Sequence, residues 1–281
     1  MKIFITGAGG QLGRELVLFA QNAGHRVTSS THDVLDITQP AEVSAALTAA
    51  RPDVVIHAAA WTAVDACEGD VDRAFAVNAK ATGFIADSAH NVGARVVYIS
   101  TDYVFDGNKP TAYTETDEPN PQSVYGASKL AGERMLSPHD AIVRISWVCG
   151  YHGPNMVKTI LRLAEGQSEL KFVQDQIGNP TFADDAAMMI IRLAEEQRRG
   201  LWHVTNQGVV SWFDFAQDVL RFAGMDPQRV IPISTDDLTP PRPAKRPANS
   251  VLDNSALRAA GLPLLADFRE PLQRLVNRLL R

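Results

Sequence analysis

The sequence predicts a doubly wound α/β fold, in which helices cover both faces of a parallel sheet. Three observations lead to this prediction. Short apolar segments alternate with helical ones through the first half of the chain, these segments are apolar throughout, and a glycine-rich turn follows the first of them. Strands that are apolar on both faces are typical of parallel sheets covered on both sides. Parallel strands joined by helices build the βαβ units of this fold class.

The first half is predicted to contain five strands and four helices. The strands are short apolar runs at residues 2–6, 26–28, 53–58, 95–100 and 141–147. The helices have apolar residues three or four positions apart, at residues 11–23, 41–50, 71–91 and 125–136. Pro40 precedes the second helix and suits a helix start, because its fixed φ is already helical and its missing N–H needs no partner there.

The second half is mixed and predicts a smaller, intertwined unit. Helices are expected at residues 157–165, 181–196, 212–223 and 268–280, and strands at 170–173, 201–204 and 229–233. Residues 238–247 hold four prolines and predict a loop or rigid strap. We expect a Rossmann-type nucleotide-binding domain at 1–147, with residues 181–205 packing back onto it. Residues 148–281 are expected to form mainly a substrate-binding domain.

Composition and charge exclude several classes of protein. The chain has 281 residues, of which 45% are hydrophobic and 21% charged, as in ordinary globular proteins. A net charge of −5 argues against nucleic acid as a partner, and no apolar run is long enough to cross a membrane. The two cysteines and seven histidines show no metal-ligand spacing, so no metal site is expected. The first strand begins at once, without a signal peptide, which makes the cytoplasm the expected location.

A glycine-rich turn, Gly7-Ala8-Gly9-Gly10-Gln11-Leu12-Gly13, lies between the first strand and the first helix. Gly7, Gly10 and Gly13 permit a tight turn and close approach of a pyrophosphate to the helix N-terminus. The free N–H groups there favour negative charge. The spacing is GxxGxxG rather than the more usual GxGxxG, and its position in the first βα unit predicts dinucleotide binding.

The end of the second strand bears on the choice between NADH and NADPH. A carboxylate here would bind the ribose hydroxyls of NAD and repel a 2′-phosphate. This chain instead has Thr28-Ser29-Ser30-Thr31-His32, and the first carboxylate comes at Asp33. Ser30 is therefore a candidate cofactor contact that favours NADPH. No arginine follows to bind the phosphate, so NADH stays open as an alternative cofactor.

Two further patterns indicate proton transfer. Tyr125 and Lys129 are four residues apart on one predicted helix, so their side chains share a face. A nearby ammonium would lower the pKa of the phenol and let it exchange a proton with a carbonyl or alcohol. The buried strand at 95–100 is followed by Thr101, at the edge where parallel sheets bind ligands. The Thr101 hydroxyl is suited to hold a substrate carbonyl.

Taken together, these patterns resemble the extended short-chain dehydrogenase/reductase family, and within it the dTDP-4-dehydrorhamnose reductases. The resemblance rests on five segments that occur in order along the chain: Ser-Thr-Asp-Tyr-Val-Phe-Asp-Gly at 100–107, Val-Tyr-Gly-Ala-Ser-Lys-Leu-Ala-Gly-Glu at 124–133, Arg-Ile-Ser-Trp-Val at 144–148, Asn-Pro-Thr at 179–181 and Arg-Pro-Ala-Asn-Ser at 246–250. It implies an NADPH-dependent reductase of a nucleotide-sugar substrate.

The resemblance also implies roles for individual residues. Tyr125 would donate the proton, Lys129 would bind the nicotinamide ribose and tune Tyr125, and Thr101 would bind the C4 carbonyl. The implied cofactor contacts are Gly10, Gln11 and Leu12 at the pyrophosphate, Asp36 and Ile37 at the adenine, and Ala60, Trp61, Thr62 and Ile99 beside the cofactor. The implied sugar-nucleotide contacts are Tyr103 and Trp147, with Asn155 and Arg246 as candidates for the diphosphate.

Several alternatives stay open beside this interpretation. A 4,6-dehydratase or epimerase shares the fold, but a dehydratase of this family has a second acidic residue where this chain has Tyr103. A ketoreductase for another nucleotide-deoxysugar would carry the same motifs. A non-catalytic regulatory subunit, like that of methionine adenosyltransferase, also resembles this family, although the intact Thr101, Tyr125 and Lys129 argue against it.

The same resemblance raises the question of a metal-linked dimer. Some of these reductases dimerise around Mg²⁺ through acidic residues of the first helix, the helix after the Asn-Pro-Thr segment, and the C-terminal tail. This chain has Glu15 and Asp184 or Asp185, but residues 275–281 contain no acidic side chain. A hard cation needs several oxygen ligands. We therefore expect no Mg²⁺, and a monomer or a weak homodimer.

Overall fold

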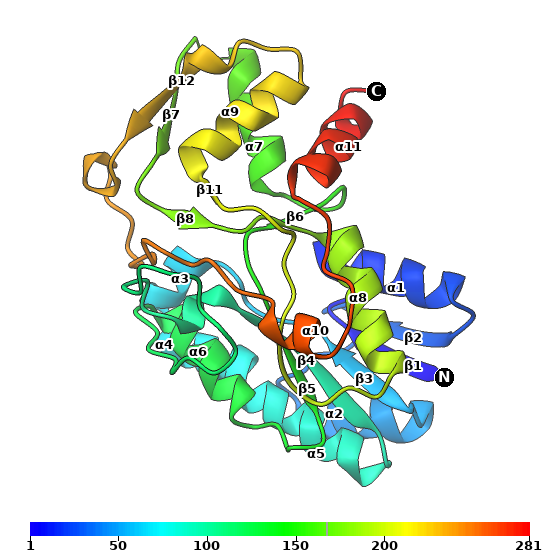
Figure 1. The fold of residues 1–281 in the computed structure, drawn as a ribbon. Coiled ribbons are helices and arrows are strands. Elements are labelled where there is room, and N and C mark those ends of the chain that lie inside the picture. The colour runs from blue at the N-terminus through cyan, green and yellow to red at the C-terminus, as the bar shows by residue number, and fades with distance from the viewer. Residues whose placement is uncertain (167) are drawn as a thin grey trace.

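The computed structural model describes residues 1–166 and 168–281 and confirms the doubly wound α/β fold (Figure 1). Its centre is a parallel six-stranded sheet in the order β2-β1-β3-β4-β5-β10. The strands are β1 (Lys2–Thr6), β2 (Arg26–Ser30), β3 (Val54–His57), β4 (Arg95–Thr101), β5 (Ala141–Ile145) and β10 (Gly200–His203). The strand order reverses beside β1, and ligands of such sheets bind in the crevice outside the carboxyl ends at that point.

Alternate residues of each strand face opposite helical layers. On β1, Ile3 and Ile5 pack with α1 (Gln11–Asn22) and α8 (Ala183–Glu195), whereas Phe4 packs on the other face with α2 (Pro40–Ala50) and α5 (Ala81–Asn91). Figure 1 shows α1 beside α8, and α2 and α5 on the far side of the strands. These two layers explain why the inner strands β1, β3, β4 and β5 are buried on both faces, whereas the edge strand β2 is largely exposed.

The helix predicted at residues 71–91 is interrupted. It consists of α4 (Val71–Phe75), the π-helical turn η1 (Ala76–Lys80) and α5, and it is preceded by α3 (Val64–Gly69), which the sequence did not predict. A π turn is typical of functional sites. Next to it runs α6 (Val124–Glu133), whose close packing requires glycine at position 132. A side chain there would come within 2.3 Å of the Asn78 carbonyl oxygen.

The second unit, at the top of Figure 1, has its own apolar core. Helices α7 (Met156–Gly166), α9 (Trp212–Phe222) and α11 (Arg269–Leu279) pack around Phe215 and Phe268, beside the parallel pair β7 (Leu170–Val173) and β12 (Val230–Ile233). Most of these elements match the predicted ranges. The predicted returning segment, 181–205, contributes α8 and the edge strand β10 to the first unit.

The sequence did not predict several short elements, because two to five residues carry too little periodicity. They are the strand pairs β6 (Val148–Cys149) with β9 (Thr181–Phe182) and β8 (Ile177–Gly178) with β11 (Val210–Ser211), the helix α10 (Ser255–Ala259), and the 3₁₀ turns η2 (Asp102–Val104), η3 (Pro227–Arg229) and η4 (Thr235–Asp237). In the described chain, no helix is both long and apolar enough to cross a membrane.

Candidate active site

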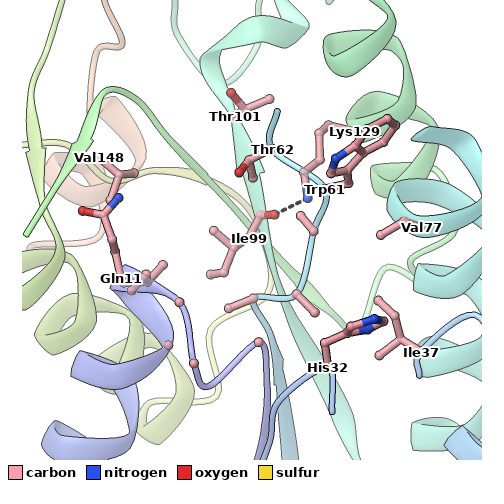
Figure 2. A pocket seen from close by; sticks show the side chains of 18 of the residues that line it. Gln11, His32, Ile37, Trp61, Thr62, Val77, Ile99, Thr101, Lys129 and Val148 are labelled. Atoms are coloured by element: carbon pink, nitrogen blue, oxygen red, sulfur yellow. Dashed lines mark hydrogen bonds between the residues drawn. The ribbon is translucent and has the colours of Figure 1, made fainter. Parts of the chain in front are cut away.

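A pocket of about 1100 Å³ opens at the carboxyl edge of the sheet. Its wall includes every residue that the sequence analysis assigned to the cofactor, the substrate or catalysis, except Asn155 and Arg246. The predicted residues on the wall are Gly7, Gly10, Gln11, Leu12, Gly13, Ser30, Asp36, Ile37, Ala60, Trp61, Thr62, Ile99, Thr101, Tyr103, Tyr125, Lys129 and Trp147. In Figure 2, His32 and Ile37 lie at one end of the pocket, while Thr101 and Lys129 lie at the other.

The glycine-rich turn forms a cradle with bare backbone facing the pocket. A Cβ atom at Gly13 would come within 2.1 Å of the Gly7 carbonyl oxygen, so only glycine lets the helix start this close to the turn. The N-cap residue of α1, Gly10, has no side chain to bind the first N–H groups of the helix. A dinucleotide pyrophosphate fits this cradle, since free N–H groups and the helix dipole favour an anion.

The end of the pocket that holds His32 and Ile37 contains a cation that the sequence analysis missed. Arg14, one turn into α1, lines the pocket and donates from Nε to the Gly9 carbonyl at 3.2 Å. It lies on the same wall as Ser30 and His32. An arginine was considered only after the second strand, whereas Arg14 comes from α1, in a different βα unit.

Asp36 accepts two hydrogen bonds from Thr38, which hold the pKa of its carboxyl below the usual value.

The catalytic end depends on how α6 approaches β4. Gly126, next to Tyr125, lets the helix pass the turn after β4, because a Cβ there would come within 2.1 Å of the Tyr103 carbonyl oxygen. The Lys129 side chain extends to β4 and donates from Nζ to the Ile99 carbonyl oxygen at 2.7 Å (Figure 2). Its ammonium lies 4.0 Å from the centre of the Tyr98 ring. Burial lowers the pKa of Lys129 to about 7.

The pKa of Tyr125 moves opposite to the predicted direction. The sequence analysis expected Lys129 to lower it, whereas burial of the phenol raises it well above the ordinary value. The reason is geometric: the Lys129 ammonium is directed at Ile99, and desolvation of the phenolate outweighs the hydrogen bond with Thr101. Tyr125 is therefore protonated at neutral pH, as a proton donor must be.

Asn78, in the π turn, lies outside the pocket wall but bonds the backbone of Trp61, which lines it, and the sequence analysis did not identify this residue. Its side chain accepts from Trp61 N at 2.8 Å and donates to Trp61 O at 3.1 Å and to Ser128 Oγ at 3.0 Å. These bonds join the loop after β3 to α6 and hold the backbone of Trp61 in place. The available signal was an amide in the middle of a predicted alanine-rich helix.

The substrate end of the wall carries aromatic rings. Tyr103 contacts Tyr125 edge to face, with ring centroids 5.6 Å apart. Trp147 has a left-handed backbone conformation, with φ of 45°, and stacks on Trp212 at 3.6 Å between centroids. A non-glycine residue in this region is strained and is typical of functional positions. The stack holds Trp147 at the end of β5, on the pocket wall.

Asn155 and Arg246 lie outside the pocket wall, each bound to protein groups. Asn155 donates from Nδ2 to Gln11 Oε1 at 3.0 Å and to the Gly150 carbonyl at 2.7 Å. Arg246 forms a two-pronged ion pair with Asp65 of α3, at 2.9 and 2.8 Å. Their assignment to a diphosphate stays a prediction. Arg246 would have to exchange Asp65 for the ligand.

The acidic groups of the possible metal-linked dimer do not fit a divalent cation. Arg274 of α11 pairs with Asp185 at 3.0 Å and approaches Asp184 at 3.6 Å. Burial and the nearby Asp184 raise the pKa of Glu15, and the positive charge of Arg278 acts in the opposite direction. Within residues 1–166 and 168–281, no three His, Cys, Asp or Glu side chains are grouped to bind a metal ion. Arginine side chains thus supply the positive charge that a cation would bring.

We expect the molar mass of this protein in solution to be independent of Mg²⁺. Static light scattering in EDTA and with added Mg²⁺ should give the same value, because Arg274 already pairs with Asp185 and lies close to Asp184. As a matched control, Arg274→Gln removes that charge while keeping a polar side chain. A dimer that dissociates when the metal is chelated would contradict the prediction.

Comparisons with known proteins agree with the geometry. The family described as "RmlD substrate binding domain" matches residues 1–281. A dTDP-4-dehydrorhamnose reductase of Mycobacterium tuberculosis is 42% identical over 280 residues, which covers 96% of this chain and 91% of that protein. A crystal structure of such a reductase from Clostridium acetobutylicum has a TM-score of 0.96 at 42% identity, with both chains covered completely. Another, from Bacillus anthracis in complex with NADP, has a TM-score of 0.94 at 38% identity and covers 99% of each chain.

Proposed function

This chain belongs to the RmlD substrate binding domain family, and on that premise we propose that it is an NADPH-dependent dTDP-4-dehydrorhamnose reductase. It would reduce the C4 carbonyl of dTDP-4-dehydro-β-L-rhamnose and form dTDP-L-rhamnose. The observation that carries the proposal is the grouping of Thr101, Tyr125 and Lys129 at one end of a pocket whose other end is a dinucleotide cradle. A relative of the same family was crystallised with NADP.

Tyr125 would account for the proton transfer in this reaction. Bound NADPH would supply the hydride to the carbonyl carbon. Tyr125 would give its phenolic proton to the carbonyl oxygen, so that the C=O group becomes CH–OH. The raised pKa of Tyr125 keeps that proton in place until charge develops on the oxygen.

Lys129 is proposed to hold the nicotinamide ribose. One of its three N–H bonds goes to the Ile99 carbonyl, which leaves two for the ribose hydroxyls. Because its pKa is lowered to about 7, Lys129 can also gain or lose a proton near neutral pH. Tyr103 and the Trp147–Trp212 stack are proposed to bind the nucleotide-sugar, since aromatic faces suit bases and sugar rings.

The decisive experiment follows NADPH oxidation by the purified protein, with and without dTDP-4-dehydrorhamnose. Rapid oxidation that requires the sugar nucleotide supports the proposal. A panel of other nucleotide-linked 4-keto deoxysugars tests the alternative of a related ketoreductase, which would use one of them faster. No oxidation with any of them would favour a non-catalytic regulatory subunit.

Replacing Ser30 with Asp should move cofactor preference from NADPH toward NADH. Ser30 is buried on the pocket wall, where a carboxylate would repel a 2′-phosphate and bind ribose hydroxyls. A repulsion of about 1.4 kcal/mol shifts the ratio of kcat/KM values about tenfold. Ser29→Asp is the matched control, because Ser29 is exposed and the side chains of adjacent strand residues point to opposite faces. Strict NADH dependence of the unmodified protein would contradict this prediction.

The assembly and location of the protein are part of the same proposal. A monomer or weak homodimer is supported by Arg274, which pairs with the acidic groups available for a metal link. The cytoplasm is supported by the two cysteines, Cys67 and Cys149, which are both buried and unpaired. The domain boundary near residue 147 also remains a proposal, supported by the separate apolar cores.

A further inference from the structure

Asp102 is a buried carboxyl group beside the reacting groups that the proposed mechanism does not use. It follows Thr101 at the end of β4, lines the pocket and is 2% exposed. Its Oδ1 accepts the Thr101 hydroxyl at 2.9 Å, while Oδ2 has no well-formed hydrogen bond to any residue that the structure describes. Buried carboxyl oxygens are normally satisfied, so this one calls for an explanation.

The hydrogen bonds of Thr101 conflict with its proposed role. A hydroxyl has one proton to donate and two lone pairs that accept. In this structure the proton goes to Asp102, and one lone pair accepts the Tyr103 N–H at 3.2 Å. The oxygen of a ketone has no proton and can only accept a hydrogen bond. While Asp102 is ionised and holds the proton of Thr101, these two oxygens have no proton to share.

We propose that Asp102 is a positioning residue that sets the direction of the Thr101 hydroxyl, and that its neutral form supports reduction. When neutral, Asp102 donates its own O–H to Thr101 Oγ1. With the Tyr125 hydroxyl turned from Thr101 to the substrate carbonyl, both lone pairs of Thr101 are filled, by Asp102 and by the Tyr103 N–H, and the Thr101 proton turns to the same carbonyl. Tyr125 still supplies the proton that is transferred. This inference rests on the proposed reductase activity.

The surroundings of Asp102 make its neutral form more accessible than that of an exposed carboxyl group. Burial raises the pKa of this carboxyl to about 6, although the nearby Ser250 hydroxyl and the hydrogen bond with Thr101 act in the opposite direction. The titratable groups that face it are the phenols of Tyr103 and, from α6, Tyr125. Both phenols are neutral at physiological pH, so neither repels the acid or stabilises its anion. Bound ligands would desolvate the carboxyl further and favour the neutral form.

The pH dependence of kcat in Asp102→Asn tests the proposal. In the unmodified protein, kcat should rise as pH falls through the pKa of Asp102, about 6 or higher in the complex. Asn donates from Nδ2 to Thr101 at every pH, so this variant should keep the low-pH turnover and lose the dependence. Thr101→Val should lower kcat about 10-fold or more, as loss of an oriented donor does, and should lose the same pH step.

Each outcome of this experiment decides between the roles. A pH dependence of kcat that persists in Asp102→Asn would overturn the proposal. A kcat that decreases as the pH is lowered would also overturn it, because the reaction would then need ionised Asp102. If Asp102→Asn melts well below the unmodified protein, Thr101→Val carries the test, because Asp102 acts only through Thr101. Turnover by the unmodified protein shows that the reductase activity is intact, so a failed Asp102 prediction is distinguishable from failure of the proposed function. Absence of turnover at any pH would overturn both.

Discussion

Tyr125→Phe should lower turnover by about 10²–10⁴-fold with the sugar nucleotide, while NADPH binding is retained. The change removes one oxygen atom and leaves the ring in its packing against Tyr103. General acid catalysis by a positioned side chain contributes a factor of this size. Steady-state NADPH oxidation measures the loss, and fluorescence titration with NADPH shows whether the pocket is intact.

Tyr113→Phe is the matched control for the loss of a buried tyrosine hydroxyl. Tyr113 is 4% exposed, lies outside the pocket and donates to Asp106 at 2.7 Å. We expect Tyr113→Phe to cost about 1 kcal/mol of stability, as for a typical hydrogen bond, and to leave turnover nearly unchanged. If Tyr125→Phe also turned over at close to the unmodified rate, Tyr125 would not be the proton donor.

Arg144→Met should lower the free energy of unfolding by about 3–5 kcal/mol, the typical cost of leaving one partner of a buried ion pair alone. Arg144 lies under the active site and bonds Glu133 through Nε at 2.8 Å and Nη2 at 2.6 Å. The two side chains are only 3% and 6% exposed. Ser100 also donates to Glu133, so the pair joins β4, β5 and α6. Urea denaturation of both proteins measures the difference.

Two variants test whether burial of the Arg144–Glu133 pair causes the loss of stability expected for Arg144→Met. Glu133→Leu combined with Arg144→Met removes both charges and should recover most of the lost stability. Arg192→Met breaks an exposed pair on α8, with Glu196 at 2.7 Å, and should cost only about 0.3–0.5 kcal/mol. A change for Arg144→Met as small as that for Arg192→Met would contradict the prediction.

The sequence determined the fold class and most of the cofactor site, because both depend on local patterns. Strand burial on two faces, helical periodicity and the turn at Gly7–Gly13 are properties of neighbouring residues. The carboxyl ends of parallel strands share one edge, so naming the strand ends already placed Ser30, Thr101 and the glycine turn in one pocket. The spacing of Tyr125 and Lys129 likewise placed both side chains on this pocket's wall.

Only the tertiary structure decided the protonation states and the hydrogen-bond partners of the residues in the pocket. The pKa of Tyr125 is set by desolvation in the folded core, and the Lys129 ammonium is directed at Ile99 by the way α6 crosses β4. Arg14 enters the pocket from α1, Asn78 supports Trp61 from the π turn, and Arg274 reaches Asp185 across 89 positions of the chain. Electrostatic energies depend on distance and burial in space, and neither is encoded in any local spacing.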